Sequence, residues 1–274
     1  MKNFLKPKNH KRVLTTAELA AIYPGISEED LPWDVIQRED TDNNIVVRYV
    51  APKAKFLQSV SDRGQNILDK EPWTNQWLKK VIKSDTVFYD VGANCGQYSL
   101  YAHALGCKRI YAFEPNIKNV YYLLENIRVN NARDSITVMP FPLKERNHLA
   151  KWISQEAGDG FSGENMSISK GTISMMHVRT IDSLQNDLDS PTVIKVDVDG
   201  TLDTLILEGA LASLDKVQHI MIEVQDWDNW NKFLPRLMVK GFKVNEEWTR
   251  MVKEDRSNHH NPGLENLCEV FLER

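Results

Sequence analysis

The sequence predicts an α/β fold: a doubly wound, seven-stranded, mostly parallel sheet with an antiparallel C-terminal hairpin, preceded by an N-terminal accessory segment. Strand-like and helix-like segments alternate over residues 86–240, a pattern typical of parallel sheets with helices on both faces. Residues 86–96 join a strand to a helix through a turn that contains glycines, a geometry that brings backbone N–H groups against a ligand. The strand-like segments 242–248 and 264–272, separated by a turn-rich stretch, predict the hairpin at the sheet edge.

The composition narrows the class of protein. The chain has 274 residues, of which 42% are apolar, which is enough for one globular α/β domain with additions. We expect an accessory segment over residues 1–70 and the main domain over residues 71–274. The net charge of −4 argues against nucleic acid as a partner, because such binding needs a basic face.

The sequence also bears on location. No apolar run reaches the length that a membrane-spanning helix needs, and the basic N-terminus lacks the apolar core of a secretion signal. The three cysteines, Cys95, Cys107 and Cys268, form no C-x-x-C pair, as is usual in reduced proteins. We therefore expect a cytoplasmic protein without membrane insertion, and nothing in the pattern indicates an oligomeric state.

Each expected element is bounded by turn residues or by a change of periodicity. In the accessory segment, the capping-box pattern of Thr15 and Glu18 predicts a short helix, and residues 44–51 predict a strand. At the start of the main domain, Pro72 predicts the first turn of another helix. Residues 144–176 are polar and glycine-rich for most of their length, so we expect a long loop beside the ligand site. In the main domain, the expected strands cover 86–89, 109–113, 135–141, 192–199 and 219–224, and the expected helices 98–105, 116–131, 202–214 and 233–240.

Two acidic residues follow the first two strands of the main domain. Asp90 precedes the turn, and Glu114 lies about 20 residues beyond it, where doubly wound folds carry the residue that binds ribose hydroxyls. Gly92 and Gly96 permit positive φ and the close approach of a ligand. A carboxylate would repel a phosphate but suits a cationic ligand, so the pattern predicts S-adenosylmethionine, which carries a sulfonium and an ammonium and has no phosphate. The Gly-x-x-x-Gly spacing disfavours a nicotinamide-dependent oxidoreductase, which stays the alternative on this fold.

A second group of charges interrupts the strand expected at residues 192–199. A central parallel strand should be almost wholly apolar, yet Lys195, Asp197 and Asp199 share one face, and Glu223 interrupts the next strand. Burying charge is unfavourable, so these groups should be paired or should line a cleft. An ion pair between Lys195 and Asp197 that only organises the core is the simpler alternative. A metal held by the carboxylates is the weaker one, because such residues are common at strand ends without metal, and we expect none.

These motifs resemble the FkbM-type methyltransferases. The resemblance covers residues 70–245 and is most specific at Asp197-Val198-Asp199-Gly200 and Glu208-Gly209-Ala210. Two departures occur: Asp199 stands where the family more often has Glu, and Thr201-Leu202 where Ala-Glu is common. The segments that carry the resemblance are 88–96, 111–116, Asn126 with Asn130, 180–184, 194–200, 208–210 and 222–224.

The resemblance implies a Rossmann-like class I methyltransferase fold with S-adenosylmethionine as cofactor. It implies O-methylation of a hydroxyl on a sugar, glycan or secondary metabolite, with the loop 144–176 over the acceptor. A non-catalytic nucleoside-binding module on the same fold is the alternative, favoured by the missing carboxylate at Leu202. We expect Asp197 to serve as the base or to orient the acceptor, followed by Asp199, Glu223 and His177. The expected cofactor-binding residues are Asp90, Gly92, Ala93, Asn94, Gly96, Glu114 and Pro115.

Overall fold

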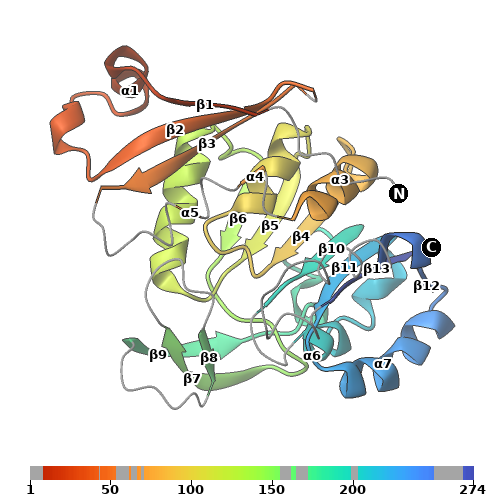
Figure 1. Cartoon of the computed structure of the whole chain (residues 1–274). Helices are drawn as coiled ribbons and strands as arrows, with labels where there is room; N and C mark the ends of the chain where they lie inside the picture. The colour runs from red at the N-terminus through yellow and green to blue at the C-terminus, as the bar shows by residue number, and fades with distance from the viewer. Residues whose placement is uncertain are drawn as a thin grey trace, which may run out of the picture.

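The central sheet of the computed structural model has seven strands, as the sequence predicts (Figure 1). They lie in the order β12-β13-β11-β10-β4-β5-β6, and every pairing is parallel except those of β13 with β11 and β12. The strands are β4 (Val87–Val91), β5 (Arg109–Phe113), β6 (Ile136–Met139), β10 (Val193–Val196), β11 (His219–Val224), β12 (Lys243–Val244) and β13 (Cys268–Glu273). The structure describes residues 9–42, 44–53, 62, 67–68, 71–154, 162–164, 172–198, 203–249 and 268–274.

Helices cover both faces of this sheet, which makes the fold doubly wound. One face packs against α3 (Pro72–Val81), α4 (Gln97–Ala104) and α5 (Ile117–Val129) through one apolar cluster. The other face packs against α6 (Asp203–Glu208) and α7 (Trp227–Val239) through a second cluster. The helices that follow β4 and β5 cover one face of the sheet, and those that follow β10 and β11 cover the other. Folds of this kind bind ligands in the crevice at the carboxyl ends of the strands where this change occurs, which here are β4 and β10.

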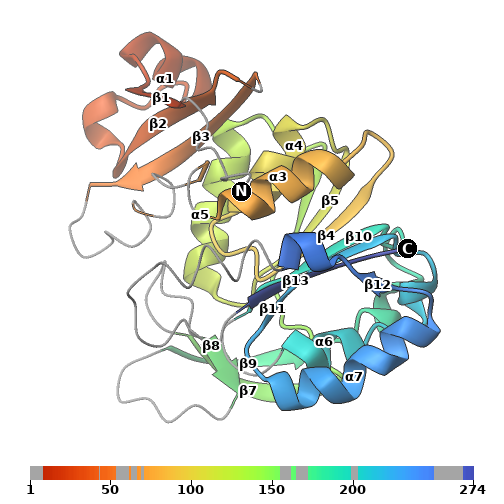
Figure 2. The same ribbon diagram turned by 45° about the vertical axis from the view of Figure 1, so that its right-hand side comes forward.

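The N-terminal segment forms a sheet of its own. Strands β1 (Asn9–Val13), β2 (Trp33–Asp40) and β3 (Ile45–Pro52) pair antiparallel, and the short helix α1 (Thr16–Ile22) follows β1. The expected capping box between Thr15 and Glu18 is present at the start of α1. This sheet lies beyond α4 and α5, apart from the central sheet (Figures 1 and 2). Sequence periodicity indicated β3 but not β1, β2 or the 3₁₀ turn Glu28–Asp30.

Two asparagines one helical turn apart on α5 fasten the N-terminal sheet to the main domain. Asn126 accepts a hydrogen bond from the backbone N–H of Val50 (2.8 Å) and donates one to the carbonyl of Cys95 (2.8 Å). Asn130 accepts from the N–H of Arg48 (2.8 Å) and donates to its carbonyl (2.6 Å). The two side chains therefore take the place of a further strand beside β3, whose backbone groups would otherwise lack partners.

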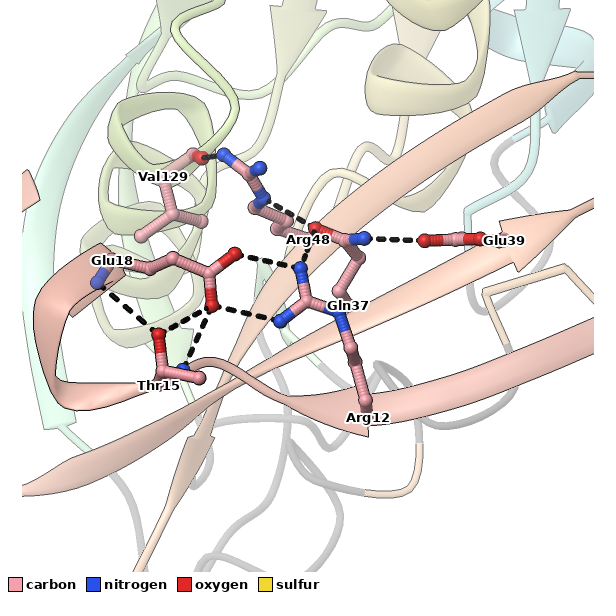
Figure 3. A network of polar contacts seen from close by, with 7 residues as sticks. All are labelled: Arg12, Thr15, Glu18, Gln37, Glu39, Arg48 and Val129. Atoms are coloured by element: carbon pink, nitrogen blue, oxygen red, sulfur yellow. Dashed lines mark hydrogen bonds and ion pairs between the residues drawn. The ribbon is translucent and has the colours of Figure 1, made fainter.

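The side chain of Arg48 adds to this attachment. It donates to the Val129 carbonyl at the end of α5 and to the side chain of Gln37 on β2 (Figure 3). Arg12 on β1 joins the same network through Glu18 and Gln37. The three strands and α1 are thereby linked to α5 by side chains from both units.

The expected long loop over residues 144–176 is only partly a loop. Strands β7 (His148–Ser154), β8 (Ser162–Glu164) and β9 (Thr172–Val178) form a third, antiparallel sheet in the order β8-β7-β9. The alternation in β7, in which Ala150 and Trp152 are buried while Leu149 and Lys151 are exposed, is the period of a half-buried strand. Polar neighbours and nearby glycines hid this alternation in the sequence.

Several element ends also differ from expectation. Strand β10 ends at Val196 rather than at Asp199, and the helix expected over 202–214 is divided into α6 and a 3₁₀ turn at Ser213–Asp215. Helix α7 begins earlier than predicted because Asp226 caps it, its side chain accepting from the N–H of Asn229. The expected strand 242–248 is reduced to β12, and residues 246–249 are helical.

The Asn126→Ala variant tests the attachment of the N-terminal sheet. It leaves the N–H of Val50 and the carbonyl of Cys95 without their side-chain partner in a buried place, so we expect the free energy of unfolding to fall by about 2–4 kcal/mol. Urea denaturation followed by circular dichroism measures this change. Leu124→Ala, at a half-exposed position of the same helix, should change stability by only about 0.5 kcal/mol or less. Equal losses in the two variants would contradict the attachment.

Candidate functional site

The turn after β4 contains three residues in the left-handed region. Gly92 has φ +81°, Asn94 +50° and Gly96 +93°. A Cβ atom on Gly92 would lie 1.9 Å from the backbone oxygen of Asp197, so only glycine permits this approach of the two strand ends. A Cβ on Gly96 would lie 2.5 Å from Leu123 of α5. Both glycines therefore make room for the protein itself, whereas the sequence suggested that they make room for a ligand.

Glu114 fixes the shape of this turn. It is 5% exposed, and its two carboxylate oxygens accept hydrogen bonds from the backbone N–H groups of Asn94 (2.8 Å) and Asn116 (2.8 Å). The side chain of Asn119 approaches one of the same oxygens at 3.4 Å. These contacts use three of the roughly four acceptor positions that a carboxylate offers.

A buried ion cluster lies beneath the turn. Lys195 on β10 and Asp90 on β4 are opposite each other in the sheet, and both side chains are 0% exposed. The Lys195 ammonium lies 3.5 Å from Asp90 and 3.1 Å from Asp197. The hydroxyl of Ser99 donates to the other oxygen of Asp90 (2.6 Å). Asp90 and Asp197 therefore share the Lys195 ammonium. The Lys195–Asp197 ion pair considered from the sequence is part of this larger ion cluster.

The charges determine the protonation of Lys195. Burial by itself would lower its pKa, but the negative charges of Asp197, Asp90 and Glu71 outweigh this and raise the pKa above its usual range. The ammonium also lies 4.5 Å from the ring centroid of Tyr98, which is a favourable cation–π distance. The hydroxyl of Tyr98 donates to the carboxylate of Glu71, the residue before α3. Lys195 therefore stays charged and is enclosed on several sides.

A pocket opens between this cluster and the N-terminal sheet. Of the expected site residues, Gly92, Ala93, Asn94 and Asp197 line it. The Asp197 side chain is 25% exposed and lies just past the carboxyl end of β10. The other described residues in its wall are Tyr49, Ile67, Cys95, Gln97, Tyr98 and Asn126.

The remaining expected residues lie elsewhere. Asp90 is enclosed beneath the pocket, and Glu114 supports the turn from behind. Glu223 lies near the end of β11 and accepts from Gln225, whose side chain also donates to the carbonyl of Val198. His177 is exposed on β9. Gly96 begins α4 as its cap, and Pro115 is half-buried after Glu114. Asp199, like Leu202, falls outside the described residues.

The sequence did not indicate Tyr49 or Gln97 as site residues. Tyr49 belongs to β3, in the segment that the resemblance does not reach, and no local pattern links it to the turn. Gln97 is the first residue of α4 and carried no signal beyond its place after Gly96. Within the described ranges, no group of three or more His, Cys, Asp or Glu side chains is arranged to hold a metal ion.

Comparison with known proteins identifies the family. The model of the methyltransferase FkbM domain matches residues 90–252. The chain belongs to the FkbM methyltransferase family. Its cofactor is accordingly S-adenosylmethionine, and the oxidoreductase alternative is set aside.

The individual proteins that resemble this chain have low sequence identity to it. The ribosomal protein L11 methyltransferase of Staphylococcus haemolyticus (strain JCSC1435) is 29% identical over 131 residues, which are 42% of this chain and 42% of that protein. The match therefore spans less than half of that relative. The crystal structure of precorrin-6y C5,15-methyltransferase from Geobacter metallireducens GS-15 has a TM-score of 0.43 at 16% identity and covers 77% of this chain and 91% of its own. A methyltransferase from Streptococcus mutans in complex with SAH has a TM-score of 0.43 at 11% identity, with coverages of 73% and 94%.

The pocket of this methyltransferase fits its cofactor chemically. S-adenosylmethionine is cationic at sulfur and nitrogen and has no phosphate, and the charged side chain in the described wall is the carboxylate of Asp197. The hydroxyl of Tyr49 is buried in the wall with no hydrogen-bond partner among the described residues, and a polar ligand would supply one.

None of the helices in the described part of the chain is both long and apolar enough to cross a bilayer.

Lys195→Met tests the role of the buried ammonium. The variant leaves Asp90 enclosed without a counter-charge, so we expect the free energy of unfolding to fall by about 3–5 kcal/mol. The double variant Asp90→Asn/Lys195→Met removes both charges and should be less destabilised than the sum of the single variants. Urea denaturation measures Lys195→Met, Asp90→Asn and the double variant. Lys79→Met, at an exposed position of α3, is the control. Strict additivity would show that the pair does not interact.

Proposed function

We propose that the protein transfers a methyl group to a hydroxyl of a sugar, glycan or other small molecule, with Asp197 orienting that hydroxyl. The observation that carries this proposal is the placement of two carboxylates on one ammonium. Asp90 is fully enclosed, whereas Asp197 is partly exposed in the pocket beside the turn. A carboxylate held in this way offers a fixed hydrogen-bond acceptor to an incoming hydroxyl.

The reaction would be an in-line displacement at the methyl carbon: the acceptor oxygen forms the O–CH3 bond, the S–CH3 bond breaks to leave S-adenosylhomocysteine, and the hydroxyl proton, hydrogen-bonded to Asp197, leaves to solvent. When bound, the cofactor supplies a methyl group already activated by its sulfonium, so the protein has chiefly to align the acceptor. The Lys195 ammonium lies 3.1 Å from the Asp197 carboxylate and so holds it in place. The main contribution of Asp197 would therefore be to orient the hydroxyl and accept its hydrogen bond.

Charge supports a small neutral acceptor over a nucleic acid. The chain carries a net charge of −4, which would repel a polyanion at long range. The carboxylate in the pocket wall would repel it at short range. The relative named for ribosomal protein L11 favours a second candidate, methylation of a protein. A carboxylate could also hold a lysine ammonium, so the product must distinguish the two.

The Asp197→Asn variant tests the proposed role. It keeps the shape of the side chain but removes its charge, so turnover should fall by about 100-fold or more while the affinity for S-adenosylhomocysteine changes only a few-fold. Radiolabelled methyl transfer measures turnover, and calorimetry measures affinity. Asp189→Asn changes a half-exposed aspartate paired with Arg109 and should leave both unchanged. Wild-type turnover in Asp197→Asn would exclude the role.

The acceptor class is tested with labelled S-adenosylmethionine and a panel of sugars, glycosides, ribosomal protein and ribosomal RNA. We expect label in the sugar or glycoside fraction, in a product that mass spectrometry identifies as a methyl ether. Label in a protein lysine would favour the second candidate, and label in RNA would contradict the charge argument. A protein that binds the cofactor but transfers no methyl group to any fraction would correspond to the non-catalytic module.

A further inference from the structure

The backbone donors of the turn are already used within the protein. A turn of this kind often binds an anionic group through its free N–H groups. Here each of the five N–H groups has an acceptor in the chain itself. The pairs are Gly92 and Ala93 with the Phe113 carbonyl (3.0 Å each), Asn94 with Glu114 (2.8 Å), Cys95 with the Asn94 side chain (2.9 Å) and Gly96 with the Ala93 carbonyl (2.7 Å).

The pocket nevertheless contains an unused donor. Tyr49 on β3 is 0% exposed and belongs to the pocket wall, yet its hydroxyl has no hydrogen-bond partner among the described residues. Burial raises the pKa of this phenol, so it is neutral and can donate its proton to an acceptor. Buried hydroxyls without partners are rare in folded proteins and call for an explanation. A bound ligand that accepts from Tyr49 provides one.

A second unused donor belongs to the wall of the same pocket. The side-chain nitrogen of Gln97 is buried and has no hydrogen-bond partner among the described residues. Gln97 is also the first residue of α4, where the helix dipole favours negative charge. Two neutral donors, one from the N-terminal sheet and one from α4, therefore face a common space.

The charges around the pocket indicate what these donors would hold. The nearby ammonium, Lys195, is enclosed and shared by Asp90 and Asp197. An anionic group in the pocket would thus depend on neutral donors rather than on a cation. S-adenosylmethionine carries one such group, the carboxylate of its amino-acid end.

We propose that Tyr49 and Gln97 together bind the carboxylate of the amino-acid end of S-adenosylmethionine, so that the N-terminal sheet forms part of the cofactor site. The proposal rests on the cofactor and pocket assigned above. Hydrogen bonds to a carboxylate are about twice as strong as those between neutral groups, and two donors fit its two oxygens. Tyr49 and Gln97 are binding residues in this scheme and take no part in the displacement.

The test compares two ligands by calorimetry: S-adenosylhomocysteine and its decarboxylated analogue, which keeps the amine and lacks the carboxylate. Tyr49→Phe should lower the affinity for S-adenosylhomocysteine about 10-fold or more and leave that for the analogue within about 2-fold. Gln97→Glu places a carboxylate against the ligand carboxylate, so it should weaken S-adenosylhomocysteine at least as much without weakening the cationic analogue. Tyr101→Phe removes the hydroxyl of another buried tyrosine, one outside the pocket wall, and should change neither affinity.

The unfolding midpoint distinguishes a binding role of Tyr49 from a structural one. Without ligand, Tyr49→Phe loses no hydrogen bond, so its unfolding midpoint should equal or exceed that of the wild type. A lowered midpoint with equal loss of affinity for both ligands would overturn the proposal in favour of a structural role. Unchanged affinity for S-adenosylhomocysteine in Tyr49→Phe would overturn it while leaving the methyltransferase assignment intact. A wild-type protein that binds neither ligand would overturn the cofactor assignment and this proposal with it.

Discussion

One enclosed ammonium group constrains the whole site. Lys195 stays charged inside the protein because the carboxylates of Asp90 and Asp197 lie 3.5 and 3.1 Å from it and Glu71 adds negative charge; removing the ammonium would leave buried carboxylate charge uncompensated. This pairing requires the register of β4 and β10, which brings the carbonyl of Asp197 against Gly92. The form of the turn and the position of the exposed carboxylate thus follow from the same ion cluster.

The attachment of the N-terminal sheet depends on a different set of contacts, the hydrogen bonds of two asparagine side chains. An edge strand presents unpaired backbone groups, and proteins usually cover or shorten such edges. Here α5 covers β3 with the side chains of Asn126 and Asn130, which imitate the donors and acceptors of a neighbouring strand. Because Asn126 also holds the carbonyl of Cys95, the attachment of the sheet and the shape of the pocket share one residue.

The central fold could be predicted from the sequence because its signals are local. The bounds of β5 and β11 agree with expectation, since each is a short β-branched or aromatic run ended by turn residues. Strand β7 was missed because polar residues carry half of its alternation. The enclosure of Asp90 could not be predicted, because the expected strand ended at residue 89, whereas β4 continues to Val91 and its Asp90 pairs with Lys195 across the sheet. Tyr49 reaches the pocket through a tertiary contact that leaves no local pattern.

The separation of the two partners along the chain has a consequence for synthesis. Val50 and Asn126 are 76 positions apart, so β3 leaves the ribosome long before the helix that covers it exists. At usual rates of translation this interval is about 4–15 s, during which the outer edge of the nascent sheet is open to other chains. Newly made protein is therefore most exposed to aggregation, and most in need of a chaperone, before the middle of the chain has been translated.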